Sequence, residues 1–234
     1  CKKQIMKLKL RFNVNESTYL RDPEKSDLGK EIVKKSIDLI HKIGYEQFTF
    51  KKLMIEVGTT EASIYRYFEN KHKILLYIIN WYWNFISYKI VFGIQNKTNQ
   101  VDKLNTIVEI ICHQDNQKFD CNYDINLLNQ IAIQESNKSY LIKDVDEKNE
   151  SEVYLSFKEL CNIIAEVILE NKPDYIYAHS LSTTILETAL QQNFFIHHLP
   201  RLTDIKLNQN ENYIQDFIKN ILSACLNIKF TENN

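Results

Sequence analysis

The stretch 48–75 constrains the fold more than any other part of the chain, because signals that start and stop helices follow one another at short intervals. Thr49 is a good N-cap, since its hydroxyl can accept a hydrogen bond from a free backbone N–H of the first turn. Gly58 stands where that helix must end, and glycine adopts a positive φ at little cost. Thr60 is a second N-cap, and Glu61 follows in the first turn, where the helix dipole favours an acid. The pattern predicts two short helices joined by a tight turn.

Apolar residues in this stretch recur at helical spacing and predict a small core. They are Phe50, Leu53, Met54, Val57, Ile64 and Phe68. Two helices joined by a turn of three or four residues that contains glycine match the helix-turn-helix pattern, whose second helix reads the major groove of DNA. An ordinary helical hairpin with an aromatic core is the alternative interpretation.

The side chains expected to face outward are the predicted DNA contacts. Small residues at the start of the second helix would let its backbone approach base edges. Tyr65, Tyr67 and Lys71 would donate to phosphates, contacts that fix position without reading sequence. The predicted DNA-binding residues are Thr49, Lys51, Thr60, Glu61, Ala62, Ser63, Tyr65, Arg66, Tyr67 and Lys71.

This segment resembles the DNA-binding domain of the TetR family of bacterial transcriptional regulators over roughly residues 27–80. The matching residues, in order, are Gly44, Thr49, Leu53, Gly58, Thr60, Ile64, Tyr65, Tyr67, Phe68, Lys71 and Leu75. Met54, Thr59 and Ala62 depart from the residues usual in the family. The resemblance implies an all-α, homodimeric, ligand-responsive repressor that binds a palindromic operator, with a diverged C-terminal sensor.

Only four glycines and three prolines occur in 234 residues, which favours long helices. We predict about nine helices, at 27–43, 50–57, 61–67, 71–92, 101–115, 122–137, 147–170, 173–197 and 211–229, with Pro173 opening the eighth. The expected organisation is a basic N-terminal arm (1–26), a helix-turn-helix DNA-binding domain (27–73) and a helical ligand-binding and dimerisation domain (74–234).

Charge is unevenly distributed along the chain. Residues 1–73 hold sixteen Lys and Arg against ten Asp and Glu, whereas the remainder holds thirteen against twenty. A basic head on an acidic body suits nucleic-acid binding by the head. The basic residues within 1–11 could follow phosphates or enter the minor groove, or form a solvated tail.

A single helix-turn-helix covers one half-site, and two copies roughly 34–36 Å apart read a palindrome. The helices at 173–197 and 211–229 are the predicted homodimer interface, because small residues allow close approach. A small-molecule effector is expected in a largely apolar cavity of the body. The predicted ligand-binding residues are Trp81, Phe85, Tyr88, His113, Tyr154, Phe157, His179 and Glu187. Plain core packing is the alternative for the aromatic residues.

Other functional classes find less support in the sequence. No phosphate loop, zinc-protease motif or nucleophile elbow occurs, so no enzyme activity is predicted. Cys112, His113, Asp115 and Cys121 lack the paired spacing of a zinc site, and we predict neither metal nor cofactor. The five cysteines show no disulfide framework, which suits the cytoplasm. No apolar run reaches 18 residues, so no membrane span is expected. A protein-interaction or metal- or redox-sensing module with the same fold is the alternative.

Overall fold

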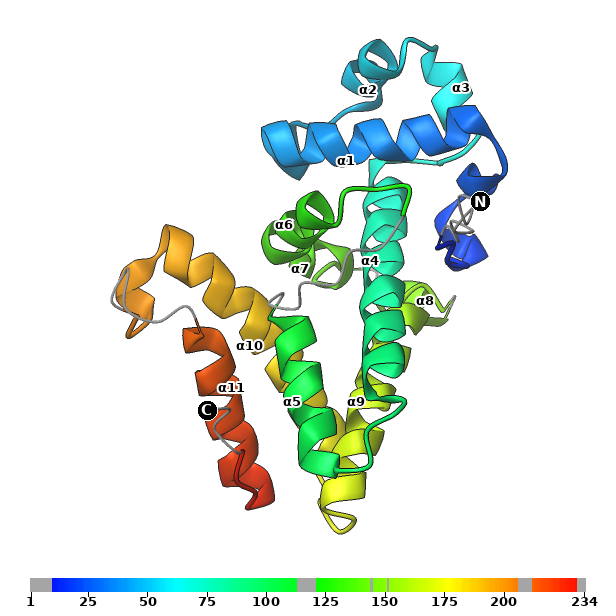
Figure 1. Cartoon of the computed structure of the whole chain (residues 1–234). Helices are drawn as coiled ribbons and strands as arrows, with labels where there is room; N and C mark the ends of the chain where they lie inside the picture. Colours follow the sequence, from blue (N-terminus) through cyan, green and yellow to red (C-terminus); the bar gives the residue numbers. More distant parts are fainter. Residues whose placement is uncertain (1–9, 113–120, 144, 151, 206–211, 231–234) are drawn as a thin grey trace, which may run out of the picture. The chain divides into compact units, whose positions relative to one another are not determined.

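The computed structural model describes residues 10–112, 121–143, 145–150, 152–205 and 212–230, and Figure 1 shows that they form helices joined by loops. Eleven α helices lie in these residues: α1 (Asp27–Gln47), α2 (Phe50–Val57), α3 (Glu61–Tyr65), α4 (Lys71–Ile94), α5 (Gln100–Ile111), α6 (Ile125–Glu135), α7 (Asn137–Tyr140), α8 (Val145–Glu150), α9 (Leu155–Asn171), α10 (Ala178–His198) and α11 (Tyr213–Leu226). Three 3-10 helices add η1 (Glu16–Thr18), η2 (Pro23–Lys25) and η3 (Pro200–Leu202). The all-α prediction is confirmed.

Two of the predicted helices differ most from the structure, for local reasons. The helix expected at 147–170 is divided into α8 and α9, and Glu152 between them has a φ of 57° that no α helix continues. Pro173 does not open the next helix but lies in a turn closed by the Tyr175 N–H, which donates to the Lys172 carbonyl at 3.1 Å. Proline suits the second position of such a turn because its φ is already fixed. Helix α10 therefore begins five residues later, at Ala178.

The chain folds into two compact units that are interleaved in sequence. Unit 1 takes its described residues from 1–82 and 117–156, and unit 2 takes them from 83–116 and 157–234. The predicted helix-turn-helix segment therefore shares a unit with α6, α7 and α8. No helix in the described part of the chain is long and apolar enough to cross a membrane.

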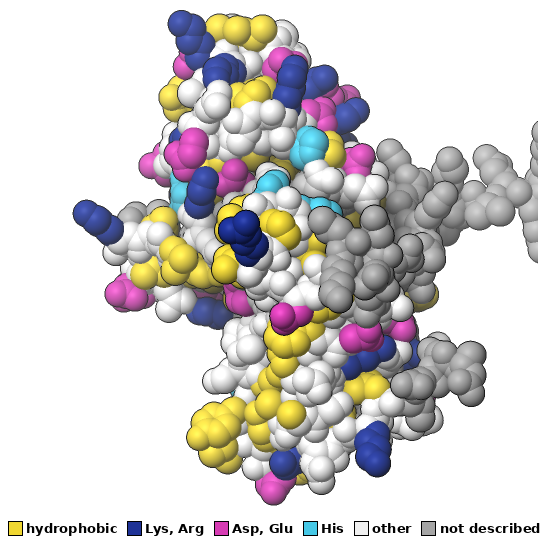
Figure 2. All heavy atoms as spheres, turned by 90° about the vertical axis from the view of Figure 1, so that its left-hand side faces the viewer, with side chains coloured by type: hydrophobic (Ala, Val, Ile, Leu, Met, Phe, Trp, Pro, Cys, Tyr) yellow, Lys and Arg dark blue, Asp and Glu magenta, His cyan; other side chains and the backbone are white. Residues whose placement is uncertain are grey.

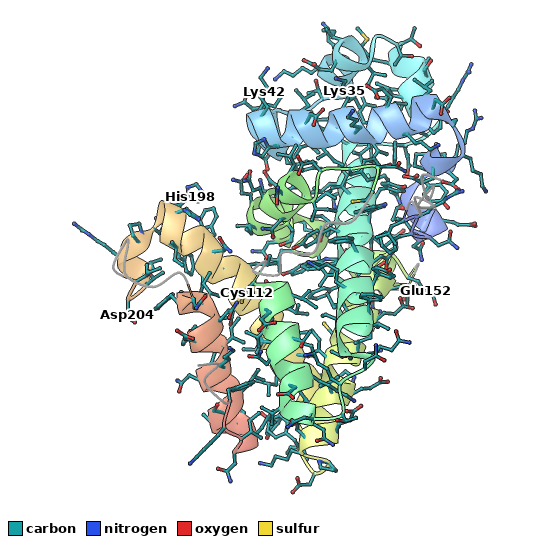
Figure 3. The ribbon with its side chains drawn as sticks, in the orientation of Figure 1. Lys35, Lys42, Cys112, Glu152, His198 and Asp204 are labelled. Atoms are coloured by element: carbon teal, nitrogen blue, oxygen red, sulfur yellow. The ribbon has the colours of Figure 1, made fainter. Side chains whose placement is uncertain are left out.

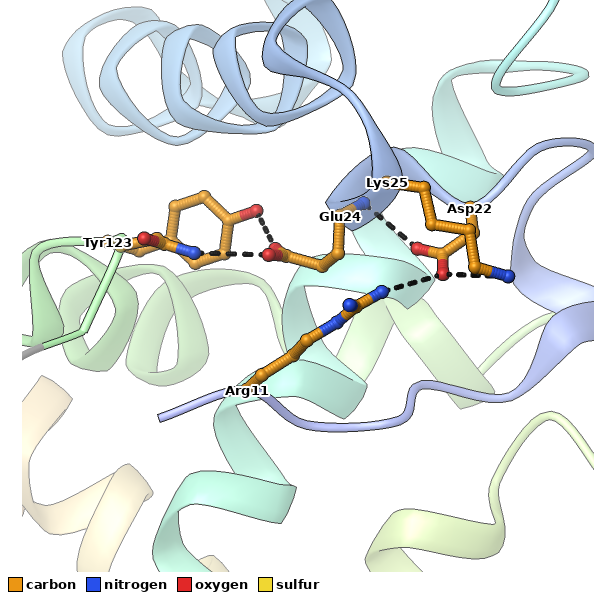
Figure 4. A network of polar contacts seen from close by, with 6 residues as sticks. Arg11, Asp22, Glu24, Lys25 and Tyr123 are labelled. Atoms are coloured by element: carbon orange, nitrogen blue, oxygen red, sulfur yellow. Dashed lines mark hydrogen bonds and ion pairs between the residues drawn. The ribbon is translucent and has the colours of Figure 1, made fainter. Parts of the chain in front are cut away.

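Unit 1 packs α1, α2 and α3 with the first part of α4 around fully buried apolar side chains: Ile32, Ile37, Ile40, Leu53, Ile64, Phe68 and Ile74. The segment before α1 is joined by polar contacts to the residues that precede α6, as Figure 4 shows. The buried Glu24 accepts hydrogen bonds from the Tyr123 hydroxyl and from Asn122 Nδ2, the latter at 3.1 Å. Asp22 accepts from Arg11 at 3.0 Å and lies 3.5 Å from the Lys25 ammonium. Residues 10–26 of the expected arm are therefore packed on unit 1.

Unit 2 contains the end of α4 with α5, most of α9, α10 and α11. Its core holds fully buried aliphatic side chains: Leu104, Ile107, Ile164, Ile168, Ile185 and Leu222. An ion pair between Lys103 and Glu170 joins α5 to α9. Helix α11 ends at Leu226 and is capped by Asn227, which has a left-handed φ of 58° and whose N–H donates to the Ser223 carbonyl at 2.9 Å.

Gly44 kinks α1 three residues before its end. Its φ of 75° and ψ of 156° lie in a region that only glycine populates readily. The kink removes the Tyr45 N–H from the helical ladder, and that donor bonds to Glu135 Oε1 of α6 at 3.1 Å. Gly44 thus sets the direction in which the chain leaves α1 for α2.

We predict that Gly44→Ala lowers the free energy of unfolding by about 1–3 kcal/mol, because an L side chain is strained at this φ and ψ. Chemical denaturation of the full chain measures the change. Asparagine distinguishes the two positive-φ glycines: Gly58→Asn should be mild, because Asn tolerates the left-handed helical region at Gly58. Gly44→Asn should cost as much as Gly44→Ala, and equal effects of asparagine at the two sites would contradict the assignment.

Candidate nucleic-acid interface

Helix α2 and the turn after it are built by local caps. The Thr49 hydroxyl accepts from the Lys52 N–H at 3.2 Å, which satisfies one open donor of the first turn. Gly58 ends the helix with φ 70° and ψ 39°. The N–H groups of Gly58 and Thr59 both donate to the Met54 carbonyl at 3.0 Å, so the turn is closed by its own backbone.

Helix α3 has only five residues and is held at its start and on its inner side. At its start, Thr60 Oγ1 accepts from the Ser63 N–H at 3.2 Å and shares a hydrogen bond with Ser63 Oγ at 3.0 Å. On its inner side, Ile64 and Phe68 are fully buried. These contacts leave the opposite side of the helix open.

The residues after α3 are fixed by the segment before α1. The Tyr67 carbonyl accepts from the Leu20 N–H at 2.7 Å, and its hydroxyl lies 2.7 Å from Ser26 Oγ. The exposed Arg21 guanidinium lies 5.3 Å from the centre of the Tyr67 ring, within cation–π range. Sequence reasoning missed Arg21, because no local pattern joins it to a residue 46 positions later.

The structure brings most of the predicted DNA-binding residues together on α2, α3 and the adjoining turns. Thr49, Lys51, Thr60, Ala62, Tyr65 and Arg66 are exposed, and Glu61 and Ser63 are half-buried. The Tyr65 ring packs edge-on against Phe50 at 4.8 Å between centroids, yet 49% of the residue remains exposed. The hydroxyl of Tyr65 can therefore approach a phosphate while its ring is held.

Two predicted phosphate donors are engaged within the protein. Tyr67 is 3% exposed and its hydroxyl meets Ser26. The Lys71 ammonium donates to the carbonyls of Tyr45 and Glu46, both at 3.2 Å, and lies 4.5 Å from the Tyr45 ring centre. A lysine has three N–H donors, so Lys71 keeps one for another partner, whereas the Tyr67 hydroxyl is buried beside Ser26.

Basic side chains surround this surface. Lys51 and Lys52 are exposed on α2, and Arg66 is exposed at the end of α3. Figure 3 shows Lys35 and Lys42 along α1, and Figure 2 shows several Lys and Arg side chains at the top of the face that it draws. Exposed basic side chains of this kind attract a polyanion such as DNA.

The predicted ligand-binding residues are divided between the two units. Trp81 and Tyr154 belong to unit 1, where Trp81 packs between Phe12 and Tyr123, and Tyr154 donates to the Ser139 carbonyl at 3.0 Å. Phe85, Tyr88, Phe157, His179 and Glu187 belong to unit 2. His113 lies outside the described residues.

Unit 2 carries a groove of about 520 Å³ along α10, which sequence reasoning did not identify. Its lining residues are Thr183, Thr184, Glu187, Thr188, Gln191, Gln192 and, from α11, Phe217. Glu187 is the one residue of the predicted ligand set among them. The lining consists mainly of Thr, Gln and Glu, with one aromatic residue, which differs from the aromatic cavity that the sequence suggested.

The described residues include two buried thiols, Cys112 and Cys161. Burial raises the pKa of the Cys112 thiol to about 12 and that of Cys161 to about 11, so neither forms a thiolate near neutral pH. No three His, Cys, Asp or Glu side chains gather as metal ligands there. His113 and Asp115, from the sequence cluster around Cys112, lie outside the described residues.

Comparison with known proteins identifies the family of the segment that carries this surface. Residues 32–78 match the family model described as "Bacterial regulatory proteins, tetR family", and this range contains α2, α3 and the capping residues described above. The segment is a TetR-family domain. No curated protein matches the chain by sequence.

Several solved structures share the fold over most of the chain. A fatty acid degradation regulator, FadR from Bacillus halodurans, is 17% identical, with a TM-score of 0.57 over 84% of this chain and 96% of its own. AibR in complex with isovaleryl coenzyme A and operator DNA is 13% identical, with a TM-score of 0.55 over 84% and 98%. The superantigen PfiT is 15% identical, with a TM-score of 0.56 over 88% and 98%. At these identities the likeness concerns the fold, and folds host different functions.

We predict that removing the hydroxyls of Tyr65 and Tyr67 separates a DNA contact from a structural contact in this TetR-family segment. Tyr65→Phe should weaken duplex binding by about 1 kcal/mol without changing the melting temperature, because the hydroxyl is free for a phosphate. Tyr67→Phe should lower the melting temperature, because the hydrogen bond between Tyr67 and Ser26 is lost. Fluorescence anisotropy with labelled duplex and thermal denaturation measure the two effects. A loss of stability in Tyr65→Phe but not in Tyr67→Phe would contradict the assignment of Tyr65 to DNA and Tyr67 to structure.

Proposed function

We propose that this protein is a transcriptional regulator that binds duplex DNA through α2 and α3. The observation that carries the proposal is the exposed side of α3, where Thr60, Ala62 and Arg66 face solvent while Ile64 and Phe68 hold the helix from behind. A short helix clamped in this way can enter the major groove with its first residues toward base edges. Residues 27–73 form the DNA-reading part in this proposal.

The proposed regulator acts as a homodimer through α10 and α11. The groove along α10 presents three threonines, whose short side chains allow close approach of a helix from a second copy. Phe217, 38% exposed on α11, lines the groove and offers apolar area. Two copies with their α3 helices about one DNA turn apart would read a palindromic operator.

The proposed regulator is a repressor whose affinity for the operator falls when a small molecule binds residues 74–234. AibR, with the same fold, is described in complex with both an acyl-coenzyme A and operator DNA. An effector shifts the balance between two states only if it binds them with different affinity. A thermal-shift screen of small apolar and acidic compounds, followed by anisotropy in the presence of each hit, tests the response.

We predict that a duplex selected from a random pool binds with an affinity that falls steeply with salt, because lysine and arginine displace counterions from phosphates. Lys51→Ala should lower the slope of log affinity against log salt by about one. Lys158→Ala is the matched control, because Lys158 is exposed on α9 in unit 2. Equal slopes in the two variants would exclude a phosphate contact at Lys51.

We predict that Ser63→Ala changes the preferred duplex sequence, as read by repeated selection, because Ser63 lies near the start of α3. Thr60 is a poorer probe, since its hydroxyl caps the helix and its loss costs about 1 kcal/mol of stability. A uniform loss of affinity for every duplex, with an unchanged order of preference, would place Ser63 away from the bases.

We predict that Thr188→Arg converts a dimer into a monomer in sedimentation velocity, because an arginine in the groove would clash with a second helix and bury a charge. Glu159→Arg is the matched control, since Glu159 is exposed on α9 outside the groove. Both variants should keep the wild-type melting temperature at low concentration. A Thr188→Arg protein that sediments as a dimer would move the interface elsewhere.

A further inference from the structure

Three backbone groups at the Gly44 kink and the end of α1 form hydrogen bonds with side chains from other helices. The Tyr45 N–H donates to Glu135 Oε1 at 3.1 Å, and the carbonyls of Tyr45 and Glu46 accept from Lys71 at 3.2 Å. Glu135 comes from α6 and Lys71 from the start of α4. The joint between α1 and α2 is therefore held by polar contacts from two other helices.

Lys138 of α7 completes this joint. Its ammonium lies 2.8 Å from Glu135 Oε2 and 3.0 Å from Glu46 Oε1, and 5.9 Å from the Tyr45 ring centre. Glu135 is 6% exposed, so its charge is sheltered from water and depends on this cation. The backbone carbonyl of Lys138 also lies 3.3 Å from His72 Nε2, next to Lys71.

A polar contact also joins α6 to α4, farther from the α1–α2 joint along both helices. The Tyr82 hydroxyl donates to Asn129 Oδ1 at 3.0 Å, six residues before Glu135. A displacement of α6 along or away from α4 would therefore carry Glu135 with it. The Tyr45 N–H, buried with its residue, would then lack an acceptor, and a buried donor without a partner is costly.

We propose that Glu135 is a positioning residue through which the α6–α7 corner sets the angle of the α1–α2 joint, and with it the alignment of α3 on DNA. This inference rests on the proposed DNA-binding function. It adds a connection through α6 to the one expected through α4. Two states are distinguished by the hydrogen bond between the Tyr45 N–H and Glu135. DNA binds the state in which this bond is made, and loss of the bond favours the other state.

The test compares Glu135→Ala, which removes the acceptor, with Glu135→Gln, which keeps an oxygen for the Tyr45 N–H. Gln134→Ala is the matched control, since Gln134 is exposed on the same helix. Affinity for the selected duplex is measured well below the melting temperature of every variant. We expect Glu135→Ala to weaken binding about 5- to 150-fold, the usual range of coupling between sites. Glu135→Gln should recover most of the loss, and Gln134→Ala should match wild type.

Amide hydrogen exchange supplies a readout that a purely structural role would not move. Duplex binding should slow exchange at residues 125–140 of the wild type, because coupling is reciprocal. In Glu135→Ala it should slow exchange only near α2 and α3. Persistence of the slowing at 125–140 in Glu135→Ala, or equal affinities of Glu135→Ala and wild type, would overturn the proposal.

Amide hydrogen exchange measured without DNA tests the role of Glu135 independently of the proposed DNA-binding function. Glu135→Ala should speed exchange at residues 45–53 relative to Glu135→Gln, whether or not any duplex binds. If the wild type bound no duplex, the proposed function would fail, and this comparison would still decide whether Glu135 holds the joint. Equal exchange in the two variants would show that it does not.

Discussion

A five-residue helix cannot hold its own shape, and this constraint governs the whole interface. Isolated helices shorter than about 12–15 residues are marginal in water, so α3 depends on its neighbours. Thr60 caps its start, Ile64 and Phe68 anchor its inner side, and Tyr67 is fixed by Leu20 and Ser26. The segment before α1 is therefore a structural part of the surface that carries α3. This segment was expected to be a basic arm, and it is also needed for packing.

The caps and turns of the interface could be predicted from sequence because each acts within about one helical turn. Thr49, Gly58 and Thr60 determine local backbone geometry by their own chemistry, and the structure places them as caps. Ser26 with Tyr67, and Tyr45 with Glu135, are separated by 41 and 90 residues. No periodic pattern joins such partners. Thus the presence of the motif could be predicted, whereas the use of Tyr67 and Lys71 inside the protein could not.

The body was less predictable for a related reason. Helix α4 is buried on nearly all sides between Ile74 and Ile90, so its aromatic side chains show no preferred face that would mark a cavity. The predicted ligand set mixed residues of two units, a division that depends on which distant segments pack together. The groove along α10 is lined largely by Thr and Gln, residues that are common on any exposed helix. Its shape arises only when Phe217 of α11 lies beside them.

The chemistry of the α1–α2 joint bears on how such a protein could switch. An apolar contact weakens gradually as two helices separate, because its energy follows the area removed from water. A hydrogen bond to a buried N–H depends strongly on distance and angle, so it is either made or lost. The Tyr45 N–H and the carbonyls beside it are joined to Glu135 and Lys71 by bonds of this second kind. A joint held in this way favours two distinct arrangements over a continuum, which is what a regulated DNA-binding surface requires.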